Sequence, residues 1–478
     1  MSTITSPPPA AVAGVATGDR VRHWIPLSVV LTGTFMAVLD FFIVNVALPS
    51  MQRSLHASPS SIEWTAAGYA LVTAVLLVAS GRLGDRFGRR ATFAVGLVVF
   101  TVGSAACGFA PNATTLVIGR VVQGVGCAMV STNVMSLIGV LYVGPERTVA
   151  LSAYAAVMGV AAIGGQLIGG ALLALDPAGL GWRSVFLINL PIGAVGALAA
   201  IRLVPESRGE AQSLDPLGIA LITAGLCALV LPLVEGRQLG WPLWGWLCLA
   251  ASPVILAAFA VRQLGLSRRG GSPLLPLALF RRRSFAAGMA AQTVFWMGQA
   301  SFFLILALYL QGGRGLSPIG AGGVFTILAV SYVFVSLRAP ALAARYGRSV
   351  ITAAGLTLAT GHLLLIGAVA LWGTGGSVLA LAPGLITAGA GMGLAIGPLT
   401  ANLLATLRPE QAGAAAGALA TAQFVGSAVG VAIVGVVFFG ALHSGYDTAL
   451  QAGLAVLVGA LALVAVLSRA MPAKEVRQ

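Results

Sequence analysis

One acidic residue and one arginine lie deep inside long apolar runs of this sequence. Asp40 is in the run 25–48 and Arg120 is in the run 113–138, whereas the other acidic residues lie near the ends of such runs. An ionisable group deep in an apolar helix is costly unless it faces a partner or a cavity, so it marks a functional site. Burial favours the neutral carboxyl and a nearby cation favours the carboxylate. A moving arginine would therefore let Asp40 bind and release a proton in turn.

The positions of Asp40 and Arg120 permit a direct contact. Asp40 lies eight residues before Leu48, and Arg120 lies eight residues after Asn112. At 1.5 Å per helical residue, both would sit about 12 Å below the same surface. Two other roles stay open. Asp40 would be a static strut held by a neighbouring arginine, and Arg120 would cap backbone carbonyls and lock helices together.

The composition shows what kind of element positions these residues. Of 478 residues, 58% are hydrophobic and only 8% are charged, which is too apolar for a soluble protein. We place fourteen runs near the length of about 20 residues that a spanning helix needs. The expected fold is an all-α polytopic membrane protein, multi-pass in a bacterial plasma membrane. The runs are 25–48, 62–80, 91–110, 113–138, 148–175, 183–203, 216–234, 243–261, 285–310, 318–337, 350–372, 378–404, 412–439 and 447–468.

The basic residues predict the orientation and exclude several functions. With both termini in the cytoplasm, 22 of the 27 Lys and Arg residues fall on the inner side, as the positive-inside rule requires. They form short clusters between apolar runs, which argues against nucleic acid as a partner. Lys474 is the sole lysine, so a phosphate loop for ATP cannot form. Without metal-ligand spacing among His, Cys and acids, we expect no cofactor and no enzyme.

The segment Gly81–Arg90 is the strongest local motif. Its glycines permit a tight turn and close helix approach, and its charges can cluster at helix ends as a conformational latch. A weaker copy at 340–348 matches Gly88 with Gly347, which suggests two related six-helix halves with the runs 216–234 and 243–261 inserted between them. The predicted latch residues are Gly81, Gly84, Asp85, Arg86, Gly88 and Arg89.

These observations divide the chain into segments. We expect a disordered cytosolic tail at 1–22, an N-terminal half at 23–210, two inserted helices at 211–265, a cytosolic linker at 266–282, a C-terminal half at 283–470 and a cytosolic tail at 471–478.

Polar residues within the runs are candidates for a substrate cavity between the halves. Gln292, Trp296 and Gln299 share one helical face at i, i+4 and i+7, although interhelical hydrogen bonding is an alternative for each. Glu63 lies near the outer mouth, where it would equally stabilise the start of a helix. The full predicted set is Asn45, Glu63, Tyr69, Gln123, Gln166, Gln292, Trp296 and Gln299.

The motifs together resemble the major facilitator superfamily, and specifically its 14-helix drug:proton antiporter branch (EmrB/QacA type). Gly81–Arg90 is similar to the loop 2-3 motif of the superfamily. The segments 39–49 and 118–124 resemble the helix 1 and helix 4 motifs of the branch, and the resemblance implies a role in proton transfer for Arg120. It covers roughly 25 to 470 and includes Trp64, Tyr69, Trp182, Arg183, Phe186, Asn189, Pro191, Leu279, Phe280, Arg281, Tyr309, Leu310 and Gln311.

The resemblance implies a proton-coupled exporter of small amphipathic drugs, driven by the proton gradient. One departure is Gln166, which stands where the helix 5 motif has proline; the small residues around it still allow close packing. The run 318–337 carries no acid, so neutral or monocationic substrates are expected rather than dications. Other possibilities are uptake, export of a lipid, siderophore or self-made antibiotic, and an uncoupled membrane binding or sensor protein.

Overall fold

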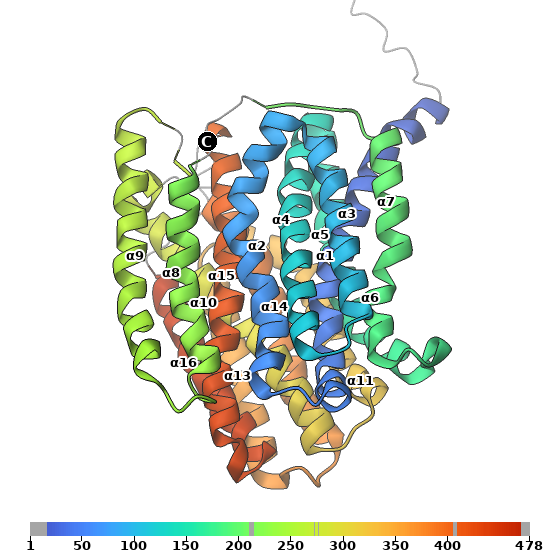
Figure 1. The fold of residues 1–478 in the computed structure, drawn as a ribbon, viewed down its shortest axis with the longest axis vertical. Coiled ribbons are helices and arrows are strands. Elements are labelled where there is room, and N and C mark those ends of the chain that lie inside the picture. Colours follow the sequence, from blue (N-terminus) through green and yellow to red (C-terminus); the bar gives the residue numbers. More distant parts are fainter. Residues whose placement is uncertain (1–16, 210–214, 272, 276, 405–408, 470–478) are drawn as a thin grey trace, which may run out of the picture.

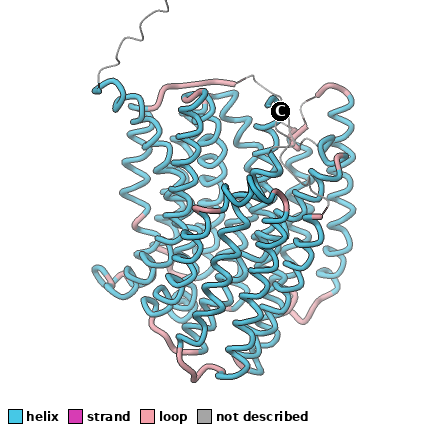
Figure 2. The backbone as a smooth tube through the Cα atoms, turned by 180° about the vertical axis from the view of Figure 1, so that it is seen from behind, coloured by secondary structure: helices cyan, strands magenta, loops and turns pink. Residues whose placement is uncertain are grey.

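The computed structural model describes residues 17–209, 215–271, 273–275, 277–404 and 409–469. Fourteen of its helices are long and apolar enough to cross a membrane, which confirms the predicted number. They stand roughly side by side in one bundle, and the described residues contain no strand (Figures 1 and 2). The start of α1 and the end of α16 lie at the same end of the bundle, called here the terminal end, and the other is the distal end (Figure 1).

The N-terminal half contains seven α-helical segments. Its fifth connection runs through two short 3₁₀ turns, Pro177–Gly179 and Gly181–Arg183, before the brief helix α6. The helices are α1 (Thr17–Leu55), α2 (Pro59–Phe87), α3 (Arg89–Gly108), α4 (Ala113–Leu141), α5 (Gly144–Leu175), α6 (Ser184–Leu187) and α7 (Asn189–Leu203).

The inserted pair and the C-terminal half follow. The inserted helices α8 (Pro216–Glu235) and α9 (Leu243–Arg268) pack on each other at one side of the bundle (Figure 1). The C-terminal half comprises α10 (Arg283–Leu308), α11 (Pro318–Ser336), α12 (Ala339–Tyr346), α13 (Ser349–Trp372), α14 (Ala382–Leu404), α15 (Pro409–Ala441) and α16 (Tyr446–Ser468), with short turns at Leu277–Arg281, Tyr309–Gly313, Val378–Leu381 and Leu442–Ser444.

The two halves share their local start and stop signals. Ser58 and Ser317 cap α2 and α11, each accepting a hydrogen bond from a backbone N–H three residues later, and each is followed by proline. Such a side chain satisfies one of the free N–H groups at a helix start. Gly88 and Gly347 end the matching segments at positive φ, 112° and 57°, where glycine avoids a steric penalty. The repeat seen in the sequence thus corresponds to matching turns.

Several boundaries differ from the expected ones, and three of the differences concern features of the architecture. The first helix begins at Thr17, inside the predicted tail 1–22, because the apolar run alone does not mark where a helix starts; 1–16 and 471–478 lie outside the described residues. The copy of the loop motif forms a separate helix, α12, after a break at Leu337, whereas α2 runs unbroken to Phe87. The end of α10 widens into a π-helical turn at Tyr309–Gly313.

The halves touch each other at the distal end. Gln311 Nε2 donates to the carbonyl of Val46 at 2.7 Å. A Cβ added at Gly170 would lie 3.0 Å from the carbonyl oxygen of Pro318, so the backbones of α5 and α11 are in close contact. The small residues near Gln166 therefore pack closely, as predicted, and α5 continues through this position without interruption.

Candidate functional site

Asp40 and Arg120 meet inside the N-terminal half. Arg120 Nη1 donates to Asp40 Oδ2 at 2.5 Å. Arg120 is 1% exposed and Asp40 is 0% exposed. The predicted contact between α1 and α4 is present. Because both side chains are almost fully buried, each charge depends mainly on its protein partners.

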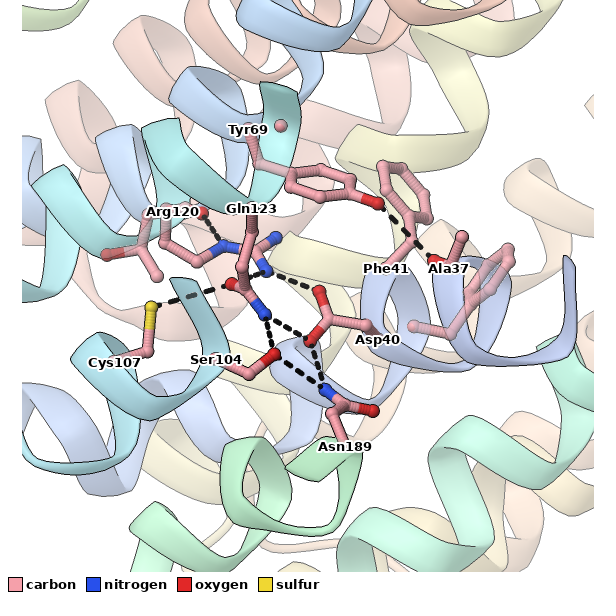
Figure 3. Close-up of polar contacts among 12 residues, drawn as sticks. Ala37, Asp40, Phe41, Tyr69, Ser104, Cys107, Arg120, Gln123 and Asn189 are labelled. Atoms are coloured by element: carbon pink, nitrogen blue, oxygen red, sulfur yellow. Dashed lines mark hydrogen bonds and ion pairs between the residues drawn. The ribbon is translucent and has the colours of Figure 1, made fainter. Parts of the chain in front are cut away.

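Asp40 has two further hydrogen-bond donors, drawn in Figure 3. Gln123 Nε2 donates to Asp40 Oδ1 at 3.0 Å, and Asn189 Nδ2 donates to the same oxygen at 2.9 Å. Both amides also contact Ser104 Oγ, at 2.7 and 3.3 Å. The carboxylate on α1 thus accepts hydrogen bonds from α4 and α7, and Ser104 on α3 contacts both amides.

Arg120 is held on its other sides as well. Its Nε donates to the carbonyl of Thr65 on α2 at 2.8 Å, and its Nη1 also reaches Gln123 Oε1 at 2.9 Å. The guanidinium carbon lies 4.2 Å from the centre of the Tyr69 ring, a cation–π contact. Arg120 therefore combines ion pairing with the carbonyl capping that was the alternative role.

A narrow cavity of about 10 Å³ lies beside Arg120, at the interface of the halves. That volume suits a single water molecule, not a drug-sized ligand, for which pockets of about 300–1,000 Å³ are usual. Its lining comes from five helices: Phe41, Val44, Asn45, Ala66, Ala70, Arg120, Ala300, Ser427 and Val431. Asp40 is not part of the lining, so Arg120 stands between the cavity and the carboxylate.

Apart from Gln166 and Glu63, which have partners elsewhere, the predicted cavity residues separate into three groups. Asn45 lines the cavity, whereas Tyr69 and Gln123 belong to the Asp40–Arg120 cluster. Gln166 Nε2 instead donates to the carbonyl of Phe42 at 3.2 Å. Glu63 lies at the distal end of α2, with Arg237 Nη2 at 3.7 Å from its Oε1.

The three α10 residues form the third group. Gln292 and Gln299 are 1% and 4% exposed, and Trp296 is half-buried. Their atoms Gln292 Oε1, Trp296 Nε1 and Gln299 Oε1 have no hydrogen-bond partner in the described part of the chain. Buried polar atoms are normally paired, so this face of α10 has unused capacity for hydrogen bonds.

The loop motif forms contacts with the segment that follows α7. Asp85 Oδ1 accepts from Arg89 Nη2 at 2.8 Å, and the carbonyl of Asp85 accepts from Gly209 N at 3.2 Å. Glu206 Oε1 accepts from the backbone N–H of Arg90 at 3.0 Å. Glycine is favoured at position 88 because its φ of 112° would strain any other residue, and a Cβ there would also displace the Glu206 carboxyl, 2.7 Å away. The motif is thus a charged turn that holds α2, α3 and the end of α7.

Other motif residues behave differently. Gly84 faces Asn133 on α4 so closely that a Cβ would overlap its amide, while Gly81 would have room for one near Thr132. The guanidinium of Arg86 lies 5.3 Å from the Phe87 ring.

Three contributors were not predicted as site residues. Asn189 is a polar residue inside an apolar run, and such a residue indicates a functional site. Ser104 lies among small residues, where sequence gives no such signal. Glu206 follows the last helix of the half, in a polar stretch of the kind that is common at protein surfaces.

Comparisons with known proteins agree with this architecture. Residues 30–431 match the Major Facilitator Superfamily. The chain is 38% identical to the "Probable actinorhodin transporter" of Streptomyces coelicolor, covering 92% of this chain and 75% of that protein. It is 32% identical to the tetracenomycin C resistance and export protein of Streptomyces glaucescens, over 91% and 80% of the two chains. The methylenomycin A resistance protein of Streptomyces coelicolor is 33% identical over 96% of each.

Solved structures share the fold. A D-xylose–proton symporter superposes with a TM-score of 0.66 at 16% identity, over 94% of this chain and 98% of that one. A POT family transporter in complex with 5-aminolevulinic acid gives a TM-score of 0.67 at 13% identity, over 93% and 96%. With fourteen spanning helices and bacterial relatives, this is a multi-pass protein of the bacterial plasma membrane. The chain therefore belongs to the Major Facilitator Superfamily, as its resemblance to the 14-helix drug:proton antiporter branch predicts.

Proposed function

We propose that this protein is a proton-coupled antiporter that exports hydrophobic or monocationic drugs by alternating access. The observation that carries the proposal is the buried Asp40–Arg120 pair beside an interface cavity. In the orientation predicted from the basic residues, the terminal end faces the cytoplasm and the distal end faces outward.

Arg120 links proton binding to the cavity in this proposal. Protonation of Asp40 removes the charge that holds Arg120, so the guanidinium is held less strongly. Because Arg120 also lines the cavity, its positive charge then acts more strongly on the contents of the cavity. A proton from outside thereby favours release of a monocationic substrate, and loss of the proton to the cytoplasm restores the ion pair.

The substrate preference follows from charge and from unpaired polar groups. Asp40 is already neutralised by Arg120, so the cavity offers little compensation for a dication, whose burial would be costly. The unpaired atoms of Gln292, Trp296 and Gln299 support hydrogen bonding to a substrate when the halves separate. Neutral or monocationic amphipathic molecules suit this combination.

The loop motif acts as the conformational latch in this scheme. Its turn connects α2 and α3 to the end of α7 through Asp85 and Glu206. Such contacts stabilise one arrangement of helix ends and so influence the populations of states more than the cavity itself.

A second candidate is export of an antibiotic that the same organism makes. The names of the relatives favour it, since they refer to transport of actinorhodin, to resistance to and export of tetracenomycin C, and to resistance to methylenomycin A. This candidate shares the mechanism and differs only in the substrate.

Everted membrane vesicles test the proposed function. With an imposed proton gradient and no ATP, vesicles containing the protein should accumulate a fluorescent monocationic drug, and an uncoupler should release it. Accumulation that persists after the gradient is collapsed would contradict proton coupling. Absence of accumulation for every compound in a broad drug panel would contradict drug export.

A further inference from the structure

The connection between the inserted helices is bound to the distal end of α2. Ser60 Oγ donates to Gln238 Oε1 at 2.6 Å. One turn further along, Trp64 Nε1 donates to Glu235 Oε1 at 2.8 Å. Ser60 and Trp64 lie at i and i+4 on one helical face, so the α8–α9 connection is joined to α2 by directional hydrogen bonds.

The inserted pair is also bound near the terminal end of the bundle. Asp215 caps α8 and accepts from Arg262 Nη2 at 2.6 Å and from Gln263 Nε2 at 2.8 Å. Gln263 Oε1 in turn accepts from the backbone N–H of Leu274 at 2.5 Å.

The segment around Leu274 leads back to α2. Arg82 Nη2 donates to the carbonyl of Pro273 at 2.5 Å. Helix α2 therefore holds the inserted helices directly at one end, and holds the chain that follows them at the other. Since Arg82 is in the N-terminal half, both attachments belong to that half.

The contacts of Arg237 and Glu63 with α15 in the C-terminal half differ from the hydrogen bonds that join the insert to α2. The Arg237 guanidinium lies 5.2 Å from the centre of the Phe439 ring. Glu63 is 1% exposed, and a Cβ added at Gly435 would lie 2.6 Å from its Oε2. Glu63 Oε2 and Arg237 Nε have no hydrogen-bond partner among the described residues. Packing without directional bonds can separate and re-form at lower cost than a hydrogen-bonded network.

We propose that the inserted helices are fixed along α2 and move with the N-terminal half, and that Arg237 is a positioning residue that holds Glu63 against α15 to close the distal end. The inference rests on the proposed transport cycle. Without Arg237, the buried Glu63 carboxyl packed on Gly435 would lose the one ion pair that it forms among the described residues, which is unfavourable for a buried polar group. Arg237 supplies that partner, so the closed distal end depends on a side chain from the insert.

Paired cysteines with one short bis-methanethiosulfonate linker test which half carries the insert. Exposed Cys227 and half-buried Cys248 are first replaced by serine. Linking S60C to Q238C, within the proposed rigid unit, should leave drug accumulation within about twofold. Linking R237C to F439C, across the moving interface, should reduce it about tenfold or more below the level of the same variant before linking, and a reductant should return it to that unlinked level. Equal inhibition by both links, or inhibition by the first alone, would overturn the proposal.

A second measurement does not depend on transport. S427C, introduced at the cavity lining, is labelled from the distal side with a membrane-impermeant maleimide. Labelling should be lost with the R237C–F439C link and kept with the S60C–Q238C link. R237Q without any link should increase labelling severalfold, whereas R237K should keep it near the level of the parent protein. Unchanged labelling in R237Q would overturn the role of Arg237, even if no drug is transported and the proposed function itself fails.

Discussion

Asp40 on α1 and Arg120 on α4 form a buried ion pair in which Arg120 alone reaches the interface cavity. The acid that can carry a proton is therefore separated from the space between the halves by the cation that it holds. In the proposed mechanism this arrangement couples protonation to cavity charge through one guanidinium, a role that a simple strut would not have.

Arg120→Lys should retain a positive charge but lose function. A lysine ammonium lacks the planar fork that reaches Asp40, Thr65 and Gln123 together. Hydrogen bonds to a charged donor contribute about 1.5–3 kcal/mol each, so loss of one or two should lower efflux tenfold or more. Initial efflux rates at matched expression test this. Normal efflux in the lysine variant would show that charge alone is sufficient.

Gly103→Ala should destabilise the N-terminal half and disturb Gln123. A Cβ at Gly103 would lie 2.6 Å from the backbone nitrogen of Gln123, so α3 and α4 must move apart, at a cost of about 1–3 kcal/mol. Gly367→Ala, at an exposed position of α13, is the matched control, because no surrounding atom lies within 4 Å of its added Cβ. Thermal unfolding in detergent should show a lower Tm for Gly103→Ala only. Equal Tm values for the two variants would mean that α3 and α4 are not tightly packed at Gly103.

Asp85→Ala should slow transport while drug binding remains. The side chain pairs with Arg89 at the motif turn, far along α2 from the cavity residues Ala66 and Ala70. Loss of a partly exposed i,i+4 pair changes stability by only a few tenths of a kcal/mol, so the effect should appear in the rate of the conformational step. Kd and maximal efflux rate, measured on one preparation, separate the two. Weakened binding with an unchanged cycle would contradict a latch.

A monovalent aromatic cation should be exported better than a divalent analogue of similar size. Among the described residues, Asp40 is the only buried acid near the cavity, and its charge is neutralised by Arg120. Glu63 is paired with Arg237 at the distal end. A second positive charge would remain poorly compensated in a low-dielectric site. Side-by-side efflux in one host tests this, and equal or faster export of the dication would place Glu63 in the drug site.

The sequence predicts the helices and the central pair well, for a simple physical reason. A spanning helix requires a long apolar run, and the fixed rise per residue gives the depth of each residue in the membrane. Counting residues along the two helices was therefore enough to predict the contact of Asp40 with Arg120. The rotation of each helix about its own axis is set by packing, and it cannot be obtained by counting residues. Asn189 and Ser104 were missed for that reason, whereas Glu206 was missed because it follows the end of α7 in a stretch that looks like ordinary surface. Glu63 was assigned to the cavity because its partner, Arg237, comes from a distant connection.

Asp40→Asn tests the central claim most directly. Asparagine keeps the size and much of the hydrogen bonding of Asp40 but cannot titrate. Glu146→Gln, at an exposed acid paired with His23, is the matched control. In proteoliposomes, drug movement and proton movement are recorded together under an imposed pH gradient. The account predicts that Asp40→Asn abolishes gradient-driven drug export and drug-dependent proton flux, while Glu146→Gln retains both. Gradient-driven export at the normal rate in Asp40→Asn would contradict it.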